Sequence, residues 1–387
     1  MNSNITSLFP ELEKDLRALH TTGVLPSQKI KALIEAGCIS AKTTISHDQI
    51  QPASIDLRLG PVAYRVRASF LPGERSSVME KVERLRLHEI DLTKSSVLEK
   101  GCVYIVPLIE EFSLPSQISG KANPKSTTGR LDIFTRLITD YGTEFERVPP
   151  GYKGKLYIEI VPRTFSVLVR ENTSLNQLRL VRGGPPPSDK QLDELHEKET
   201  LVYSEDGLPG QAMISKGLWL SVDLRGSSDS EVIGYRAKRH APLIDLNEIN
   251  YYEPLEYWDP ISRSKTNQII LNPDDFYILV SKEKISVPHN FAAAMVPYDP
   301  SVGEFRIHYA GFFDPGFGYG SGDIKGTNAV LEVRSHEVPF LLEDGQVVGR
   351  LIYERLLAVP EKVYGKSIGS SYQCQGLSLS KQFKRLS

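Results

Sequence analysis

The chain contains one pattern of strands and turns twice, and this repeat constrains its fold more than any other feature. Residues 101–126 and 275–301 each read as a strand, a polar break, a Ser-Leu-Pro or Ser-Val-Pro step, and a small-residue strand ending in a proline-containing turn. A Pro-Gly-aromatic turn follows in each copy, at 149–154 and at 314–320. Self-similarity of this kind predicts two copies of one domain.

Each copy also places one glutamate in the apolar strand that follows its Pro-Gly-aromatic turn. Glu159 lies in Leu-Tyr-Ile-Glu-Ile and Glu332 in Val-Leu-Glu-Val, and matching strands at 54–60 and 221–226 open the two copies. A single such carboxylate is as often on the solvated face of a strand as in a site. Recurrence in the strand that follows the same turn favours a site, where burial would raise the pKa of the carboxyl group and let it exchange protons near neutral pH.

Composition excludes several classes of protein. The length of 387 residues suits two domains. The formal net charge of −2 provides no overall positive field to attract nucleic acid. Its three cysteines form no C-x-x-C pair, so neither a zinc cluster nor a disulfide framework is indicated, and a cytoplasmic location is expected. The N-terminus lacks a signal-peptide pattern, and no stretch is apolar enough to predict a membrane span.

Short strands between Gly, Pro and Asn turns fill most of the sequence and predict a mainly β fold. Helix is expected only near the N-terminus, in the linker and in short turns, with the clearest helix at 26–37 between Pro26 and Gly37. Three consecutive prolines and a charged stretch mark the linker. The expected division is an arm at 1–23, a β domain at 24–181, a linker at 182–212, a second β domain at 213–360, and a polar flap at 361–387 that orders over a ligand.

Two further segments carry chemistry. Residues 124–130, Pro-Lys-Ser-Thr-Thr-Gly-Arg, combine two cations, three hydroxyls and a glycine, which are the donors that a polyphosphate needs, although a solvated turn is the alternative. Residues 308–316 read as a hairpin whose small residues let the backbone approach a flat base edge. Asp314 in that hairpin is placed to orient a sugar hydroxyl or a water, or to form a purely structural turn.

Together these segments resemble the dCTP deaminase family, which shares its fold with the dUTPases. Residues 51–60 are similar to the family's opening, 124–130 to its phosphate motif, and 308–316 to the hairpin that receives the pyrimidine. The resemblance covers most of 24–181 and 218–380 and implies two tandem dUTPase-like domains, each a distorted β-barrel or jelly roll, behind a short helical N-terminal region.

The resemblance also implies the site residues. The catalytic candidates are Glu332, Glu159, Ser126 and Arg130. The nucleotide-binding candidates are Lys125, Ser126, Thr127, Arg130, His308, Ala310, Asp314, Tyr364, Tyr372 and Gln375. Glu332 is favoured over Glu159 because its half of the chain keeps the hairpin and the flap.

Each half departs from the family in one motif. The first copy has Val148-Pro-Pro-Gly151 where the family has Ile-Asp-Pro-Gly, and the second copy has no matching cation pair at 297–301. Two readings stay open: a site assembled from both halves, or one working half and one scaffold.

The implied activity is zinc-independent hydrolytic deamination of dCTP to dUTP and ammonia, a step in the synthesis of pyrimidine deoxynucleotides. The H-x-E and P-C-x-x-C ligands of the zinc deaminases are absent, so a strand glutamate would carry the protons, with Mg²⁺ bound through the triphosphate. The resemblance also implies dTTP as an effector and a homo-oligomer, with a trimer favoured. The alternatives are a dUTP diphosphatase, a bifunctional enzyme that performs both steps, and a non-catalytic nucleotide-binding module.

Overall fold

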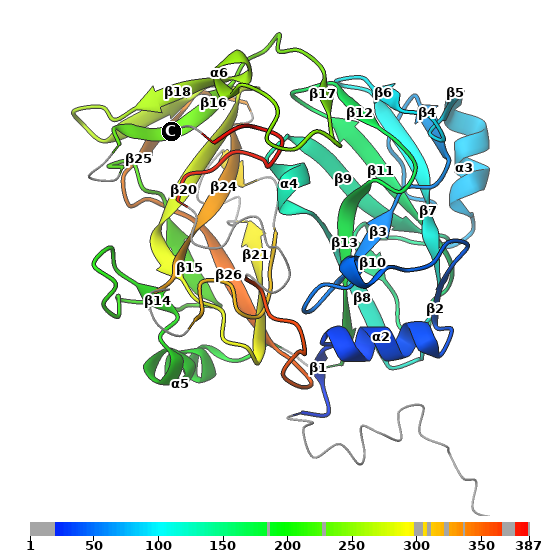
Figure 1. Ribbon diagram of the computed structural model, residues 1–387, viewed down its shortest axis with the longest axis horizontal. Coiled ribbons are helices and arrows are strands. Elements are labelled where there is room, and N and C mark those ends of the chain that lie inside the picture. Colours follow the sequence, from blue (N-terminus) through cyan, green and yellow to red (C-terminus); the bar gives the residue numbers. More distant parts are fainter. Residues whose placement is uncertain are drawn as a thin grey trace, which may run out of the picture.

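The computed structural model describes residues 20–183, 186–226, 230–297, 305–307, 311–320, 325–335, 337–365 and 376–385. Figure 1 shows two β domains side by side, with a short helix and the C-terminal segment between them. The mainly β fold predicted from the sequence is confirmed. Residues 1–19 of the expected arm and residues 366–375 of the expected flap lie outside the described ranges.

The first domain consists of two larger sheets and one small sheet. The large sheet has the order β5-β4-β7-β11-β9, with β2 beside β7: Arg86–Asp91, Val62–Val66, Val103–Ser113, Lys153–Pro162, Ile133–Thr139 and Ile39–Ala41. The second sheet has the order β1-β13-β8-β10, with β3 beside β13: Gly23–Val24, Ser174–Arg182, Ile118–Pro124, Arg147–Val148 and Ile55–Arg58. The small sheet, β17-β12-β6, joins two strands of this domain to one strand from the second: β12 at Val167–Val169, β6 at Ser96–Leu98, and β17 of the second domain at Ile244–Asp245.

The second domain repeats this plan. Its large sheet has the order β18-β16-β20-β24-β22, with β14 beside β20: Trp258–Ser262, Val232–Ala237, Phe276–Ile285, Thr327–Ser335, Phe305–Ile307 and Val202–Tyr203. Its second sheet is β15-β26-β21-β23: Leu218–Ser221, Val347–Arg355, Phe291–Pro297 and Phe312–Phe313. The pair β19-β25 corresponds to β6-β12: Gln268–Leu271 and Phe340–Glu343.

Strand register makes the two predicted glutamates equivalent. Glu159 of β11 pairs with Ile105 of β7, and Glu332 of β24 pairs with Ile278 of β20. The two glutamates therefore occupy the same place in two sheets of the same strand order, as the repeat in the sequence predicts.

The helices are short and include one that the sequence analysis missed. They are α2 at Ser27–Glu35, the 3₁₀ turn η1 at His47–Gln49, α3 at Val78–Leu85, α4 at Ser126–Gly129, α5 at Asp189–Glu199 and α6 at Pro254–Tyr257. α2 confirms the predicted N-terminal helix, and α5 the charged helix of the linker. The expectation that helix is limited to the N-terminal region, the linker and short turns is wrong for α3, whose Ser77 and Glu80 form a capping box that was readable in the sequence.

The two domains share buried contacts, so they pack as one body. At their boundary the rings of Phe165 from the first domain and Trp258 from the second have centroids 5.5 Å apart. Arg334 of β24 is buried and crosses to the first domain, where its guanidinium forms an ion pair with the buried carboxylate of Asp132. The same guanidinium donates to the hydroxyl of Thr164 at 2.8 Å.

Replacing Asp132 by Asn should lower the free energy of unfolding by about 3–5 kcal/mol, because the guanidinium of Arg334 would stay buried without its counter-charge. Chemical denaturation followed by tryptophan fluorescence measures this loss, since Trp258 lies buried at the domain boundary. Asp259→Asn is the matched control, because its ion pair with Arg236 is about 40% exposed on both sides and should contribute under about 1 kcal/mol. Equal effects of the two changes would contradict a stabilising role for the buried pair.

Candidate active site

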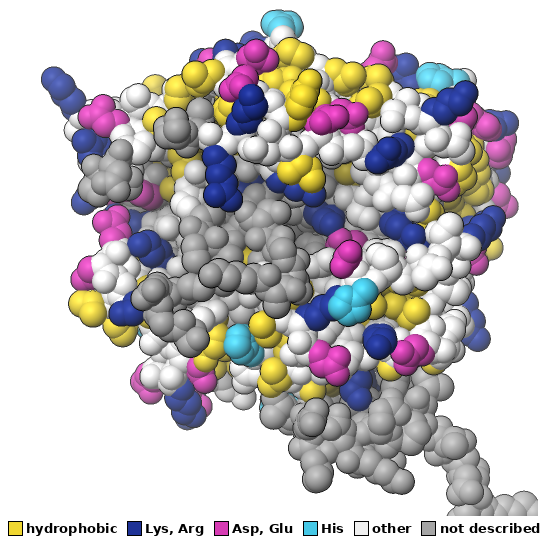
Figure 2. Space-filling view, viewed as in Figure 1, with side chains coloured by type: hydrophobic (Ala, Val, Ile, Leu, Met, Phe, Trp, Pro, Cys, Tyr) yellow, Lys and Arg dark blue, Asp and Glu magenta, His cyan; other side chains and the backbone are white. Residues whose placement is uncertain are grey.

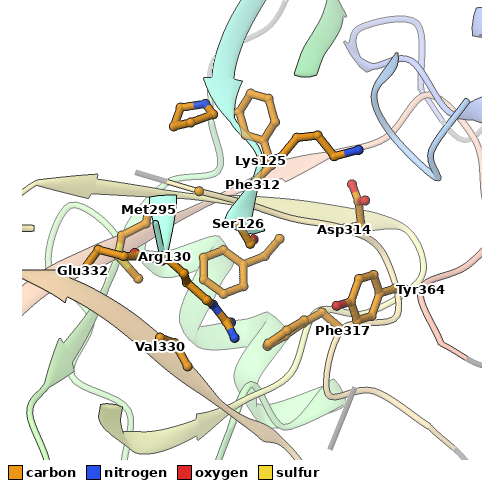
Figure 3. Close-up of a pocket in the computed structure, with 13 residues that line it drawn as sticks. Lys125, Ser126, Arg130, Met295, Phe312, Asp314, Phe317, Val330, Glu332 and Tyr364 are labelled. Atoms are coloured by element: carbon orange, nitrogen blue, oxygen red, sulfur yellow. The ribbon is translucent and has the colours of Figure 1, made fainter. Parts of the chain in front are cut away.

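A pocket of about 60 Å³ lies between the two domains and draws its walls from both. The first domain supplies the loop and first turn of α4, and the second supplies β24, the hairpin at β23 and the start of the C-terminal segment (Figure 3). Its lining residues are Pro124, Lys125, Ser126, Arg130, Met295, Gly311, Phe312, Phe313, Asp314, Phe317, Val330, Glu332 and Tyr364.

The predicted phosphate loop folds into one tight helical turn. The carbonyl of Lys125 accepts from the backbone N–H groups of Thr128 at 2.8 Å and Gly129 at 3.0 Å, and the carbonyl of Ser126 accepts from the N–H of Arg130 at 3.0 Å. This turn brings Lys125, Ser126 and Arg130 to one pocket. The ammonium of Lys125 forms an ion pair with the buried carboxylate of Asp56 on β3, so part of its charge is already matched.

Arg130 is held by the C-terminal segment. Its Nη1 donates to the backbone carbonyls of Ser378 at 3.1 Å and Leu379 at 3.4 Å, and the residue is buried. The expectation that the whole tail is a flap and not core is wrong for this part, because Leu379 and Phe383 belong to the hydrophobic core. The ring of Phe383 lies 5.3 Å from that of Tyr257, and this apolar contact explains why a polar-looking segment is packed.

Glu332 projects from β24 into the pocket and is buried, with 6% of its surface exposed. No described side chain forms an ion pair with it. Burial raises the pKa of Glu332 from its ordinary value to about 7, and the positive charge of Arg130 acts in the opposite direction. In Figure 3 Arg130 extends across the pocket between Glu332 and Phe317. A carboxyl group with this pKa can both accept and release a proton near neutral pH.

The hairpin carries a second buried carboxyl group, Asp314, on the other side of the pocket (Figure 3). Burial raises the pKa of Asp314 to about 6, while the charge of Arg179 acts to lower it. Arg179 comes from β13 of the first domain, and its Nη2 lies 3.8 Å from Oδ1 of Asp314. The Arg179 guanidinium also lies over the ring of Phe312 at 4.0 Å and donates to the carbonyl of Ala293 at 3.1 Å.

Gly316 lets the hairpin approach the start of the C-terminal segment. Its φ is +97°, and a Cβ at this position would lie 3.0 Å from the carbonyl oxygen of Tyr364. The N–H of Tyr364 donates to the carbonyl of Pro315 at 2.8 Å, and its ring lies 5.4 Å from that of Phe317. The Pro-Gly turn therefore fixes Tyr364 at the pocket.

Glu159 lies elsewhere, although it is equivalent to Glu332 by register. Its buried Oε1 accepts from Nε of Arg136 at 2.9 Å and from Nη2 at 2.6 Å. The Arg136 guanidinium lies 3.7 Å from the centre of the Phe145 ring. Tyr157, two residues before Glu159 and so on the same face of β11, packs with Val78 and Val82 of α3. The helix that the sequence analysis missed thus covers the glutamate face in the first domain.

The predicted site residues therefore separate into four groups. The structure brings Lys125, Ser126, Arg130, Asp314, Tyr364 and Glu332 to one pocket. Thr127 lines a neighbouring cavity. Glu159 is paired with Arg136 in the first domain. His308, Ala310, Tyr372 and Gln375 lie outside the described residues.

Sequence analysis also missed residues that shape the site. Arg334 is a single cation in an apolar strand, the same kind of signal as the strand glutamates, and Arg179 lies between two leucines of β13. Arg334 follows Glu332 by two residues, so strand periodicity alone placed it on the same face. No signal in the sequence pointed to Asp132.

Neither a metal cluster nor a membrane helix is found in the described ranges. No three His, Cys, Asp or Glu side chains there lie close enough together to hold a metal ion. No helix of that part of the chain has the length and apolar character needed to cross a bilayer.

Comparison with known proteins gives consistent matches along the chain. The sequence model of the 2′-deoxycytidine 5′-triphosphate deaminase N-terminal domain matches residues 21–184, and that of the C-terminal domain matches residues 188–383. A curated relative from Nanoarchaeum equitans, "dCTP deaminase, dUMP-forming", is 27% identical over 202 residues, which are 48% of this chain and 94% of the relative. A "dCTP deaminase" from Shewanella amazonensis is 27% identical over 139 residues, 34% of this chain and 68% of the relative.

A solved structure is similar over nearly the whole length. The crystal structure of 2′-deoxycytidine 5′-triphosphate deaminase from Agrobacterium tumefaciens matches with a TM-score of 0.83 and 50% sequence identity. The match covers 87% of this chain and 100% of that chain. With both domain models matched in order, this chain belongs to the 2′-deoxycytidine 5′-triphosphate deaminase family.

Proposed function

We propose that the protein converts dCTP and water to dUTP and ammonia, with Glu332 as general base and general acid and without zinc. One observation carries the proposal: Glu332 is buried in an interdomain pocket, forms no ion pair with a described side chain, and has a pKa raised to about 7. The names of the relatives support the substrate.

In this reaction Glu332 takes a proton from water, whose oxygen attacks C4 of the cytosine ring. The carboxyl group delivers this proton to N3, then takes the proton of the new C4 hydroxyl group and passes it to the exocyclic nitrogen, so that the C4–N bond breaks, ammonia leaves and C4 becomes a carbonyl. Arg130 stabilises the negative charge that develops during the reaction, because its guanidinium is buried and already held by two backbone carbonyls. Ser126 positions the water or the amine.

The remaining pocket residues bind the nucleotide in this proposal. Asp314 takes a sugar hydroxyl, and Lys125 and Ser126 face the phosphates. Magnesium would be held by oxygens of the triphosphate, since Asp56, the carboxylate that contacts the phosphate loop, is already paired with Lys125. A trimeric assembly and dTTP as an effector stay predictions of the resemblance, and a cytoplasmic location stays a prediction from the cysteine pattern.

A second candidate is the dUMP-forming reaction, in which deamination is followed by cleavage of the α–β phosphate bond. The names of several relatives favour it, including one from Corynebacterium diphtheriae that is 28% identical over 131 residues. Asp314, with its pKa near 6, is the described carboxyl group placed to activate a second water.

Product analysis tests the proposal directly. Incubation with dCTP and Mg²⁺, after removal of zinc by a chelator, should release ammonia and dUTP in equal amounts. Chromatography of the nucleotides and an ammonia assay measure both products. Pyrophosphate and dUMP would support the dUMP-forming candidate, and binding of dCTP without any product would leave only the binding module.

Glu332→Gln should abolish turnover and spare dCTP binding measured by calorimetry, because the shape is retained and the proton carrier is lost. Glu159→Gln is the matched control at the equivalent position of the first domain. It should leave turnover unchanged and lower the free energy of unfolding by about 3 kcal/mol, because it breaks the buried ion pair with Arg136. Loss of turnover in the Glu159 variant alone would reverse the two assignments.

Glu332→Gln should also stabilise the fold at alkaline pH. The pKa of Glu332 rises from its ordinary value of 4.5 to about 7 on folding, so the folded state holds a proton more tightly than the unfolded state. The resulting cost is absent below about pH 4, grows between the two pKa values and reaches about 3 kcal/mol above pH 7. Denaturation of both proteins at pH 4 and pH 8 measures this difference, and equal stabilities at pH 8 would contradict it.

The pH dependence of turnover should report the same group. We expect kcat/KM, which reports the titrating groups of the free enzyme, to fall as the pH drops below about 7, because the base form of Glu332 is lost. Arg130→Gln should shift the midpoint of this limb to higher pH, since the charge of Arg130 lowers the pKa of Glu332. A midpoint near 4.5 in the unmodified protein would mean that another group is the base.

A further inference from the structure

The residue before β23 in the second domain and the residue before β10 in the first domain occupy equivalent positions. They are Gly311 and Glu146. The carbonyl of Gly311 accepts from the N–H of Met295 at 3.0 Å. The carbonyl of Glu146 accepts from the N–H of Ala122 at 2.9 Å. Met295 and Ala122 each lie two residues before the proline that ends their strand, so the same backbone contact fixes both positions in the repeated fold.

Gly311 leaves space in the pocket that contains Glu332. It lines that pocket, and a Cβ added to it would meet no atom of the described residues within 4 Å. The fold could therefore accommodate a side chain at this position, but that side chain would take up volume in a pocket of only about 60 Å³. The lack of a side chain at Gly311 thus serves the ligand and not the packing.

The first domain fills the same position with the side chain of Glu146. The φ of Glu146 is +62°, a left-handed conformation that favours glycine. Its N–H donates to the carbonyl of Leu137 on β9 at 3.0 Å, and its Oε2 accepts from the N–H of Leu137 at 3.2 Å. The side chain is thus folded back against β9, inside the hairpin that corresponds to the one around Asp314.

Two further side chains close this hairpin. Counted from the Pro-Gly turn, Phe145 stands where the second domain has Ala310. The guanidinium of Arg136 lies 3.7 Å from the centre of the Phe145 ring and pairs with Glu159, the counterpart of Glu332. The first domain therefore has Phe-Glu where the second has Ala-Gly, and its strand glutamate is covered.

Glu146 fills this space as an uncharged group at neutral pH. Burial raises its pKa to about 8, while the hydrogen bond from the N–H of Leu137 acts to lower it. A solvated position was available, because Figure 2 shows Lys, Arg, Asp and Glu side chains spread over the first domain, on the right in this view. The nearby Glu144 takes such a position, with 71% of its side chain exposed. The inward position of Glu146 therefore indicates a space that needs to be filled.

We propose that the first domain contains a closed copy of the Glu332 pocket, filled by the side chains of Phe145 and Glu146, and that each chain therefore has one open pocket for a pyrimidine base. The lack of a side chain at Gly311 keeps the copy in the second domain open. This inference rests on the proposed function, because the ligand of the open copy is taken to be the cytosine ring of dCTP.

The closed copy retains donors that a pyrimidine ring could use. Without Glu146 the N–H of Leu137 would lose its acceptor. The buried amide of Asn176 is near enough to lower the pKa of Glu146, and its Nδ2 makes no hydrogen bond within the described residues. The carbonyl oxygen and N3 of cytosine are acceptors for such donors. An opened first-domain copy should therefore bind the free base.

Calorimetry with dCTP tests the open copy. The unmodified protein should bind one dCTP per chain. Gly311→Ala should weaken this binding at least tenfold and leave the denaturation midpoint unchanged, because the added methyl group meets no described atom of the fold but occupies space that the ligand needs. Two sites per chain, or unchanged affinity in the Gly311→Ala protein, would overturn the proposal.

The change Phe145→Ala with Glu146→Gly copies the open hairpin into the first domain and tests the closed copy. It is made together with Gly311→Ala, so that the open copy does not contribute. Cytosine at millimolar concentration should shift the denaturation midpoint of this variant upward by several degrees. Should the loss of Phe145 unfold the protein, Glu146→Gly replaces the pair of changes, since glycine suits the φ of this position.

Glu144→Gly, also combined with Gly311→Ala, is the matched control, because Glu144 is an exposed glutamate of the same loop. Its midpoint should not respond to cytosine. Absence of a shift in the opened variant, or an equal shift in the control, would contradict the closed copy. This experiment requires neither turnover nor binding of dCTP by the unmodified protein, so failure of the proposed function and failure of this inference give different results.

Discussion

Two buried arginines cross the boundary between the domains in opposite directions, and the site depends on both. Arg334 leaves β24 of the second domain to reach Asp132 and Thr164, and Arg179 leaves β13 of the first domain to reach the hairpin around Asp314. Burying a guanidinium is costly unless its charge and donors are matched, and here the partners lie on the other domain. Each domain therefore completes the polar interior of the other. The same contacts fix the position of α4 relative to β24, and so of Arg130 relative to Glu332.

Much of this architecture was predictable, because strands and turns follow local patterns in the sequence and the repeat shows the same patterns twice. The strands containing Glu159 and Glu332, the turns that precede them and the loop at 124–130 were found at the predicted places. Equivalence of the two glutamates followed from their place in the apolar strand after the same turn in each copy. The different surroundings of the two glutamates could not be predicted in this way, because strand register decides which residue lies opposite each of them on the neighbouring strand. Arg136 pairs with Glu159 across β9 and β11, and the two lie 23 residues apart in the chain.

The errors arose where short segments gain their structure from distant contacts. α3 buries only Val78 and Val82, but its apolar residues recur at helical spacing, at 78, 79, 82 and 85, so this pattern and the capping box were both readable in the sequence. The tail reads as polar, yet Phe383 enters an aromatic cluster whose other members come from 252–258. A single aromatic residue is enough to anchor a polar segment, and the average composition of the segment does not reveal that residue. The sequence left open whether the site is assembled from both halves, because the relative position of the two domains is set by contacts between residues far apart in the chain.

What covers the glutamate face of each sheet explains why two equivalent carboxylates have different roles. In the first domain the face of β11 is covered by α3, an element of the same domain with an apolar surface, and Arg136 matches the charge of Glu159. In the second domain the face of β24 meets the other domain, which presents the polar turn of α4. Glu332 is thus desolvated without an ion pair to any described side chain, and this combination raises its pKa toward neutrality. An ion pair of the same strength at Glu332 would hold the group as a carboxylate and remove its ability to return a proton. The chemistry therefore follows from the partner domain, and the repeated strand supplies only the position.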